Sequence, residues 1–195
     1  MFFTTDEEHY RRFKPLEEHW RTMLAEVPPF NLETVTLKRE IGEWADTANG
    51  RELFEKLQSN TNWIKGWDEA WFNFPLIFND TAIGKADLLC PKTIALLKSV
   101  GGINIAGFSI LLPKSILNLH KDTTGPTTNS IAFNMKLAGS NSKLYITSDQ
   151  GFTSHTHRDG EAVLFNSEIE HYATNEGPTN RVILYVDARV GPTSS

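Results

Sequence analysis

Three side chains that could bind a metal, those of His120, Asp122 and His171, form the most informative pattern in the sequence. Two imidazoles and one carboxylate hold Fe(II) on one side and leave the other coordination positions open for a co-substrate and oxygen. Residues two apart in an extended strand point to the same side, so His120 and Asp122 can reach one ion. His171 follows Asp122 by 49 residues, which leaves room for intervening strands. The alternative interpretation is a turn histidine beside a solvated Asp122.

A cation follows this pattern: Arg181 lies ten residues after His171 and directly before an apolar run at residues 182–186. The run predicts a buried strand, and a buried arginine needs an anionic partner. A dicarboxylate co-substrate such as 2-oxoglutarate could supply a carboxylate, which a guanidinium binds with two parallel hydrogen bonds. The residues therefore predict an Fe(II)- and 2-oxoglutarate-dependent oxygenase that uses O2. The alternative for Arg181 is an ion pair at the edge of a sheet.

A second group of potential ligands competes with the first. His155, His157 and Glu161 resemble a cupin-type metal set, and His157 with Asp159 repeats the histidine-x-aspartate spacing. Residues 148–160 are polar and rich in turn formers, however, which predicts a solvent-exposed hairpin. The functional alternative for this segment is a loop that faces the substrate.

Composition limits the class of protein. A length of 195 residues with 39% hydrophobic and 22% charged residues is typical of one globular domain. A net charge of −5 argues against nucleic acid or an anionic membrane as a partner. The single Cys90, which we expect to be a buried apolar residue, excludes an internal disulfide and fits a reducing compartment. The sequence also shows no apolar run of 18 residues and no basic-then-apolar leader, so we expect a cytoplasmic protein.

The two halves of the chain differ in their predicted elements. Helical spacing of apolar residues begins at Phe13, residues 51–57 and 90–100 also predict helices, and the latter segment has Gly101 at its end. Trp63, Trp67 and Trp71 recur at a helical spacing of four and are expected in the core, whereas His9 and His19 are expected at the surface.

From residue 103 onward the pattern changes to short strands that are separated by turn residues. At least seven such segments follow one another, each rich in β-branched or aromatic residues. The chain therefore predicts a mostly β fold, a double-stranded β-helix (a jelly roll, cupin-like) packed by helices. We expect a single domain over residues 1–195, with residues 1–100 as a helical support and residues 101–195 as the jelly-roll core.

Longer motifs lie within residues 90–189: FSILLPKSILNLH, then TGPT, then GEAVLFNSEIEHYATNEGPTNRVILYVDAR. This segment resembles the aspartyl/asparaginyl β-hydroxylase family, which has a jelly-roll core and belongs to the Fe(II)/2-oxoglutarate oxygenases. The resemblance implies that His120 and His171 are iron ligands, that Arg181 binds the co-substrate, and that Ser109 lies near it. Two further family positions, often Arg and His, fall on Asn134 and Lys136.

The sequence departs from the family at the metal. Animal members read H-T-G-P and lack a carboxylate ligand, whereas this chain reads HKDTTGP, two residues longer and with Asp122 in the ligand position. That resembles the full triad of the related proline 3-hydroxylases. Lys136 could still contact a carboxylate, but Asn134 could donate only neutral hydrogen bonds.

The leading hypothesis is a hydroxylase that acts on an unactivated C–H bond of an amino acid, a peptide or a related small substrate. The N-terminal half lacks the helical repeats of the protein-modifying members, so a small substrate or a short peptide is at least as well supported as an epidermal-growth-factor-like domain. A non-catalytic cupin-like module that binds a metal or ligand is the alternative, since GEAVLFNSEIEHYATN matches a cupin-like spacing. The third hypothesis is a degenerate family member that binds iron but does not turn over a substrate. The sequence does not determine the oligomeric state.

Overall fold

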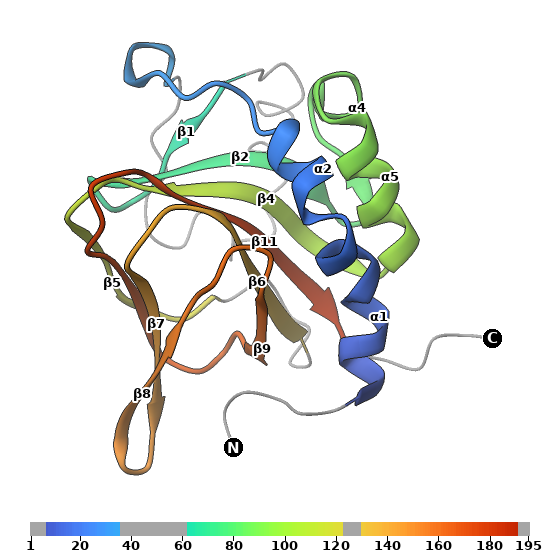
Figure 1. Ribbon diagram of the computed structural model, residues 1–195. Helices are drawn as coiled ribbons and strands as arrows, with labels where there is room; N and C mark the ends of the chain where they lie inside the picture. The colour runs from blue at the N-terminus through green and yellow to red at the C-terminus, as the bar shows by residue number, and fades with distance from the viewer. Residues whose placement is uncertain (1–6, 36–61, 123–129, 191–195) are drawn as a thin grey trace, which may run out of the picture.

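Two antiparallel β-sheets face each other, and helices cover the outer face of the larger sheet (Figure 1). The computed structural model describes residues 7–35, 62–122 and 130–190. The helices are α1 (Glu7–Glu18), α2 (Trp20–Ala25), the 3-10 helix η1 (Leu32–Thr34), α4 (Ala86–Leu89) and α5 (Pro91–Val100). The strands are β1 (Ile64–Lys65), β2 (Trp71–Phe78), β3 (Thr81–Ala82), β4 (Ile103–Leu111), β5 (Ser115–His120), β6 (Ser130–Ala138), β7 (Ser142–Ser148), β8 (Gly151–Thr156), β9 (Ala162–Asn166), β10 (His171–Asn175) and β11 (Arg181–Arg189).

The strand order confirms the predicted jelly roll. The larger sheet has the order β1-β2-β4-β11-β6-β9, with β3 paired to β2, and the smaller sheet has the order β5-β10-β7-β8. Neighbours in space are distant in the sequence, because β11 lies between β4 and β6. This arrangement allows residues from several strands to meet inside the barrel.

Alternate residues of a strand face opposite sides, which divides the apolar residues into two clusters. On β11, Leu184 and Val186 belong to the cluster beneath the helices, whereas Tyr185 packs against the cluster between the sheets. Helix α1 contributes Phe13, whose ring stacks on that of Phe133 in β6 with centroids 4.9 Å apart. The space between the sheets thus has its own lining, separate from the core that holds the helices in place.

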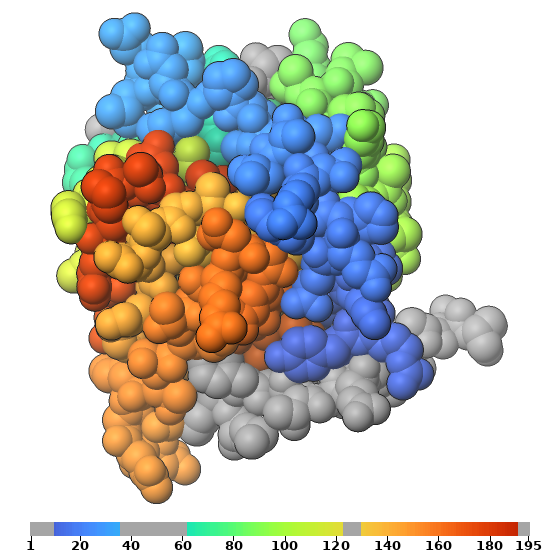
Figure 2. Space-filling model, in the orientation of Figure 1, coloured from blue at the N-terminus to red at the C-terminus, as the bar shows by residue number. Residues whose placement is uncertain are grey.

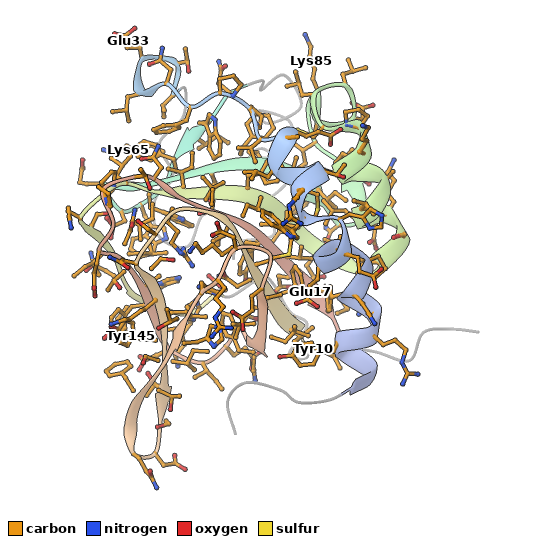
Figure 3. The ribbon with its side chains drawn as sticks, in the orientation of Figure 1. Tyr10, Glu17, Glu33, Lys65, Lys85 and Tyr145 are labelled. Carbon is orange, nitrogen blue, oxygen red and sulfur yellow. The ribbon has the colours of Figure 1, made fainter. Side chains whose placement is uncertain are left out.

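Helix α1 also covers one edge of the larger sheet. Tyr10 and Glu17 lie on the side of α1 that faces the strands (Figure 3). The Glu17 Oε1 atom accepts a hydrogen bond of 3.2 Å from the backbone N–H of Ala162, at the start of the edge strand β9. An edge strand with unpaired backbone groups can pair with another chain, and this contact satisfies one of those groups.

The helical interpretation of the tryptophan spacing is wrong. Trp71 begins strand β2, while Trp63 and Trp67 lie in the segments on either side of β1. The alternation of buried Phe72 and Phe74 with less buried neighbours is the period of a strand, and it overrides the spacing of four. Trp63 is in the core as expected, with 1% of its surface exposed.

The division at residue 100 into a helical and a β part is also wrong, because β2 pairs with β4 inside the larger sheet. The helix predicted at residues 90–100 is confirmed as α5, with Pro91 in its first turn and Gly101 after it at a φ of 65°. The predicted helix at residues 51–57 and the TGPT motif at residues 124–127 lie outside the described residues.

Three further predictions concern single residues. Cys90 is fully buried as expected, and burial raises the pKa of its thiol to about 12. His19 is exposed as expected, and the side chain of His9 lies outside the described part of the chain.

Among the described helices, none has both the length and the apolar character that crossing a membrane requires.

Candidate metal centre

The two histidines of the predicted metal site meet because their strands are neighbours in the smaller sheet. His120 ends β5, His171 begins β10, and the antiparallel register places these two residues directly opposite each other. Asp122 follows β5 by two residues. One potential ligand atom from each of the three residues lies within 4.8 Å of the others. The pairing of β5 with β10 thus brings together residues that the sequence separates.

Hydrogen bonds to the backbone orient both rings. The Nδ1 atom of His120 lies 2.6 Å from the carbonyl oxygen of Asn118, and that of His171 lies 2.8 Å from the carbonyl oxygen of Ile169. A carbonyl can only accept, so each Nδ1 carries the hydrogen, and in the neutral ring the Nε2 lone pair remains for a metal. Both Nε2 atoms face Asp122, at 3.6 Å from its Oδ1 for His120 and 3.2 Å from its Oδ2 for His171.

Two hydrogen bonds fix the position of Asp122. Its backbone N–H donates to the carbonyl of Ser167 over 2.9 Å. Its Oδ2 atom accepts a hydrogen bond of 2.7 Å from the hydroxyl of Tyr185, which lies on β11 in the opposite sheet. Groups that hydrogen-bond to metal ligands set the orientation of those ligands. Tyr185 is therefore a residue of the site that the sequence analysis missed.

The charges at the site suit metal binding. Burial by itself raises the pKa of the Asp122 carboxyl, but the rings of His171 and His120 and the Tyr185 hydroxyl outweigh it and hold that pKa well below its usual range. Burial lowers the pKa of His120, whereas Asp122 outweighs burial at His171 and raises the pKa of that ring. Metals bind carboxylates and neutral imidazoles, so the lowered pKa values of Asp122 and His120 favour the forms that bind a metal.

Aromatic rings surround the histidines. The ring of Trp67 packs edge-on against His120 with centroids 5.2 Å apart, and the ring of Phe165 packs in the same way against His171 at 4.9 Å. Trp71 lies next to Trp67 and donates a hydrogen bond of 2.6 Å from Nε1 to the Oγ atom of Ser109. Apolar rings at this position exclude water from one side of the site. No sequence signal distinguished these two tryptophans from ordinary core residues.

A cluster of buried polar side chains lies on the central strands of the larger sheet. Arg181 begins β11, and Ser109 on β4 and Lys136 on β6 both stand opposite Ile183 of that strand. Asn134, two residues before Lys136, accepts a hydrogen bond of 3.4 Å from the Nη2 atom of Arg181. All four of these polar residues are at most 5% exposed. The fold thus places the four residues assigned to the co-substrate on three adjacent strands.

Of the two cations in this cluster, Arg181 is the one that is poorly neutralised among the described residues. The Nε atom of Arg181 is buried without a hydrogen-bond partner, and the described residues offer the guanidinium no carboxylate partner. Burial lowers the pKa of Arg181 to about 10. Lys136 has an ion pair of 3.1 Å with Asp159, whose side chain is 49% exposed. A buried arginine without an anion is costly, so the cluster suits a ligand that carries a carboxylate.

The second histidine group is not gathered like the first in the described part of the chain. Potential ligand atoms of His120, Asp122 and His171 lie within 4.8 Å of one another, whereas those of His155, His157 and Glu161 do not converge in this way. The predicted exposed hairpin is confirmed for β8, which projects with β7 from the body of the molecule (Figure 2). For His157 the expected exposure is wrong, because only 3% of its surface is accessible.

A jelly roll with two histidines and one carboxylate at neighbouring strand ends defines the class of the protein. The chain belongs to the aspartyl/asparaginyl β-hydroxylase family, whose sequence pattern matches residues 17–190. It is similar to the uncharacterised protein L888 of Acanthamoeba polyphaga mimivirus, with 29% identity over 82% of this chain and 58% of the relative. It is also similar to the ornithine lipid ester-linked acyl 2-hydroxylase of Rhizobium tropici, with 30% identity over 62% of this chain and 42% of the relative. The chain therefore spans about half the length of these relatives.

Solved structures with a similar arrangement share little sequence with the chain. An oxidoreductase of the 2OG-Fe(II) oxygenase family from Burkholderia pseudomallei has a TM-score of 0.49 and 10% identity, over 74% of this chain and 80% of that protein. The cupin domain of a transcriptional regulator from Enterobacter cloacae has a TM-score of 0.41 and 13% identity, over 63% of this chain and all of that domain.

Proposed function

We propose that this chain is an Fe(II)- and 2-oxoglutarate-dependent oxygenase that hydroxylates an unactivated C–H bond. The observation that carries the proposal is the joint geometry of the three ligands. Their potential donor atoms lie within 4.8 Å of one another, and both rings present Nε2 because Nδ1 is held by a backbone carbonyl. Two imidazoles and one carboxylate, with no thiolate, suit Fe(II) with open positions better than structural zinc.

The residues present also fit a dicarboxylate co-substrate. Arg181 offers a buried guanidinium whose Nε has no partner, and a carboxylate matches its fork with two hydrogen bonds. The ammonium group of Lys136 adds a second positive charge, and Ser109 and Asn134 add polar groups on the neighbouring strands. We infer that Arg181 binds the far carboxylate of 2-oxoglutarate, with these three residues around the co-substrate.

The bound iron, 2-oxoglutarate and O2 would supply the oxidising chemistry, in which 2-oxoglutarate becomes succinate and carbon dioxide and one oxygen atom enters the substrate. The chain's own contribution is orientation and exclusion of water. Tyr185 holds Asp122, the carbonyls of Asn118 and Ile169 hold the rings, and Trp67 closes one side of the site. A dry, pre-oriented site is what such chemistry requires from a protein.

The substrate that we propose is small. Amino acids and short peptides follow from the family resemblance, and one relative is named for hydroxylating the ester-linked acyl group of an ornithine lipid. We expect no nucleic acid partner, because the net charge of −5 opposes binding to phosphates. The experiment therefore tests a panel of these compound classes and not one compound.

The test is a co-substrate turnover screen. The iron-loaded protein is incubated with 2-oxoglutarate and O2 over a panel of amino acids, short peptides and an ornithine lipid, and succinate is measured together with product mass. We expect a panel member to increase succinate formation and to gain the mass of one oxygen atom, and we expect His171→Ala to show neither. Tight metal binding with no succinate above His171→Ala for any panel member would instead support the non-catalytic cupin-like module.

A further inference from the structure

We propose that His157 is a co-substrate-binding residue, whose neutral imidazole donates a hydrogen bond to the far carboxylate of a dicarboxylate 2-oxo acid. The ring would act beside Arg181 and Lys136 and would favour dicarboxylates over monocarboxylates. The inference rests on the proposed function, since it assumes that a 2-oxo acid binds at the metal. It assigns a ligand to a histidine that the sequence placed on an exposed hairpin.

The first observation is that the ring of His157 is buried without a hydrogen-bond partner. His157 is 3% exposed, and neither Nδ1 nor Nε2 makes a hydrogen bond within the described residues. The carbonyl of Asn134 lies near enough to oppose the pKa shift of the ring, but not in a position that satisfies either nitrogen. Buried polar atoms are nearly always hydrogen-bonded, so two unsatisfied nitrogens on one ring indicate a missing polar partner.

The backbone of His157 is fixed, so its ring is not a loosely placed surface group. Its carbonyl accepts a hydrogen bond of 3.1 Å from the Nζ atom of Lys136, and its N–H donates to the carbonyl of Ser142 over 3.3 Å. Lys136 belongs to the buried cluster around Arg181 on the central strands. The backbone of His157 is therefore anchored at the edge of the cluster to which we assign the co-substrate.

The surrounding charges decide what kind of partner is missing. Burial holds the pKa of His157 well below its usual value, and the positive charges of Arg181 and Lys136, together with the neighbouring ring of His155, lower it further. The ring is therefore neutral at physiological pH and carries one N–H donor. A group that accepts a hydrogen bond from this donor and also neutralises Arg181 must be an anion, and a carboxylate meets both requirements.

The experiment measures binding of two 2-oxo acids to the Mn(II)-loaded protein by calorimetry without O2. Both ligands have the same metal-chelating end, but 2-oxoglutarate has a far carboxylate and pyruvate has none. The variants are His157→Phe, which keeps a ring and loses the donor, and His157→Gln, which keeps a neutral donor. His19→Gln, at an exposed histidine, is the matched control.

We expect His157→Phe to weaken 2-oxoglutarate binding roughly 10- to 100-fold, as for a lost hydrogen bond to a charged group, and to change pyruvate binding by less than about threefold. His157→Gln should recover most of the affinity, and His19→Gln should match the parent. Unchanged 2-oxoglutarate binding in His157→Phe overturns the inference, and so does an equal loss for both acids. If the parent binds metal but no 2-oxoglutarate, the proposed function fails as well.

A second measurement uses the unaltered protein and does not depend on how a variant folds. Ring ¹⁵N signals of His157 are recorded in the Zn(II)-loaded parent, assigned with the His157→Gln spectrum. Addition of 2-oxoglutarate should shift the protonated ring nitrogen of His157, and addition of pyruvate should leave it unchanged. A His157 signal that is the same with and without 2-oxoglutarate contradicts the proposed contact.

Discussion

The hydroxyl of Tyr185 donates a hydrogen bond of 2.7 Å to Oδ2 of Asp122 and so links strand β11 of the larger sheet to the candidate metal ligand that follows β5 of the smaller one. Burial raises the pKa of Tyr185 well above its usual value, and the charge of Asp122 raises it further. The phenol therefore stays protonated and remains a donor. This hydrogen bond thus couples the distance between the two sheets to the position of Asp122.

Removing the Tyr185 hydroxyl should weaken the metal site without destroying it. Loss of a hydrogen bond to a metal ligand costs about 10- to 100-fold in metal affinity, and we expect Tyr185→Phe to fall near the lower end of this range. Mn(II) affinity is the measurement. Tyr145→Phe is the control, because Tyr145, which is labelled in Figure 3, lies on β7 of the smaller sheet and its ring stacks on that of Tyr172. Equal affinities for Tyr185→Phe and the parent would show that the contact does not orient Asp122.

Asp122 should be a direct ligand. Asp122→Ala should lower metal affinity by more than about 100-fold, because a lost ligand costs more than a lost outer hydrogen bond. Asp159→Ala, at the aspartate of the second histidine-x-aspartate pair, should leave metal affinity unchanged. Fe(II) titration without O2 gives both values. A site that retains full affinity in Asp122→Ala would use two histidines alone.

Arg181 should set the requirement for 2-oxoglutarate. Losing a buried charge partner costs on the order of 2–5 kcal/mol, so Arg181→Met should raise the apparent KM for 2-oxoglutarate by roughly 30-fold or more. Arg181→Lys keeps the charge but loses the fork, and should lie between Arg181→Met and the parent. Metal affinity, followed in parallel, should not change. An unaltered KM in Arg181→Met would place the far carboxylate elsewhere, with Lys136 the first residue to test.

His157 should make the metal-free protein less stable in acid. Its pKa is well below the unfolded value of about 6.5, so below that pH the unfolded chain binds more protons than the folded one. The free energy of unfolding should fall as the pH drops through this range, by up to about 1.4 kcal/mol per pH unit from this residue. Chemical denaturation at several pH values should show a shallower slope in His157→Phe. Parallel slopes for the parent and the variant would mean that the folded protein accommodates a charged His157.

The neighbourhood of His120 and Asp122 could be predicted from sequence because it is local, whereas His171 joins them only through the pairing of β5 with β10. A separation of two residues in an extended segment is enough to place His120 and Asp122 on one side. The apolar run after Arg181 predicts that this arginine is buried. Tyr185 could not be assigned in this way. It is one aromatic residue in an apolar strand, and only the packing of two sheets shows which side it faces.

Tertiary packing also overrode local signals in two places. His157 is flanked by polar residues that predict exposure, yet its segment turns inward after β8 and buries the ring. The three tryptophans recur at a helical spacing, yet Trp71 begins β2 and the other two lie on either side of β1. Because β2 of the N-terminal half pairs with β4 of the C-terminal half, we infer that the two halves fold as one domain.

The most direct test of the proposed oxygenase is the fate of molecular oxygen. The iron-loaded protein is supplied with 2-oxoglutarate, ¹⁸O2 and the panel substrate that increases succinate formation, with the parent compared with His171→Ala and His19→Ala. We predict succinate that contains one ¹⁸O atom in the parent and in His19→Ala, and none above background in His171→Ala. Succinate without ¹⁸O, or equal labelled succinate in His171→Ala and the parent, would contradict the assignment of an oxygenase centre to His120, Asp122 and His171.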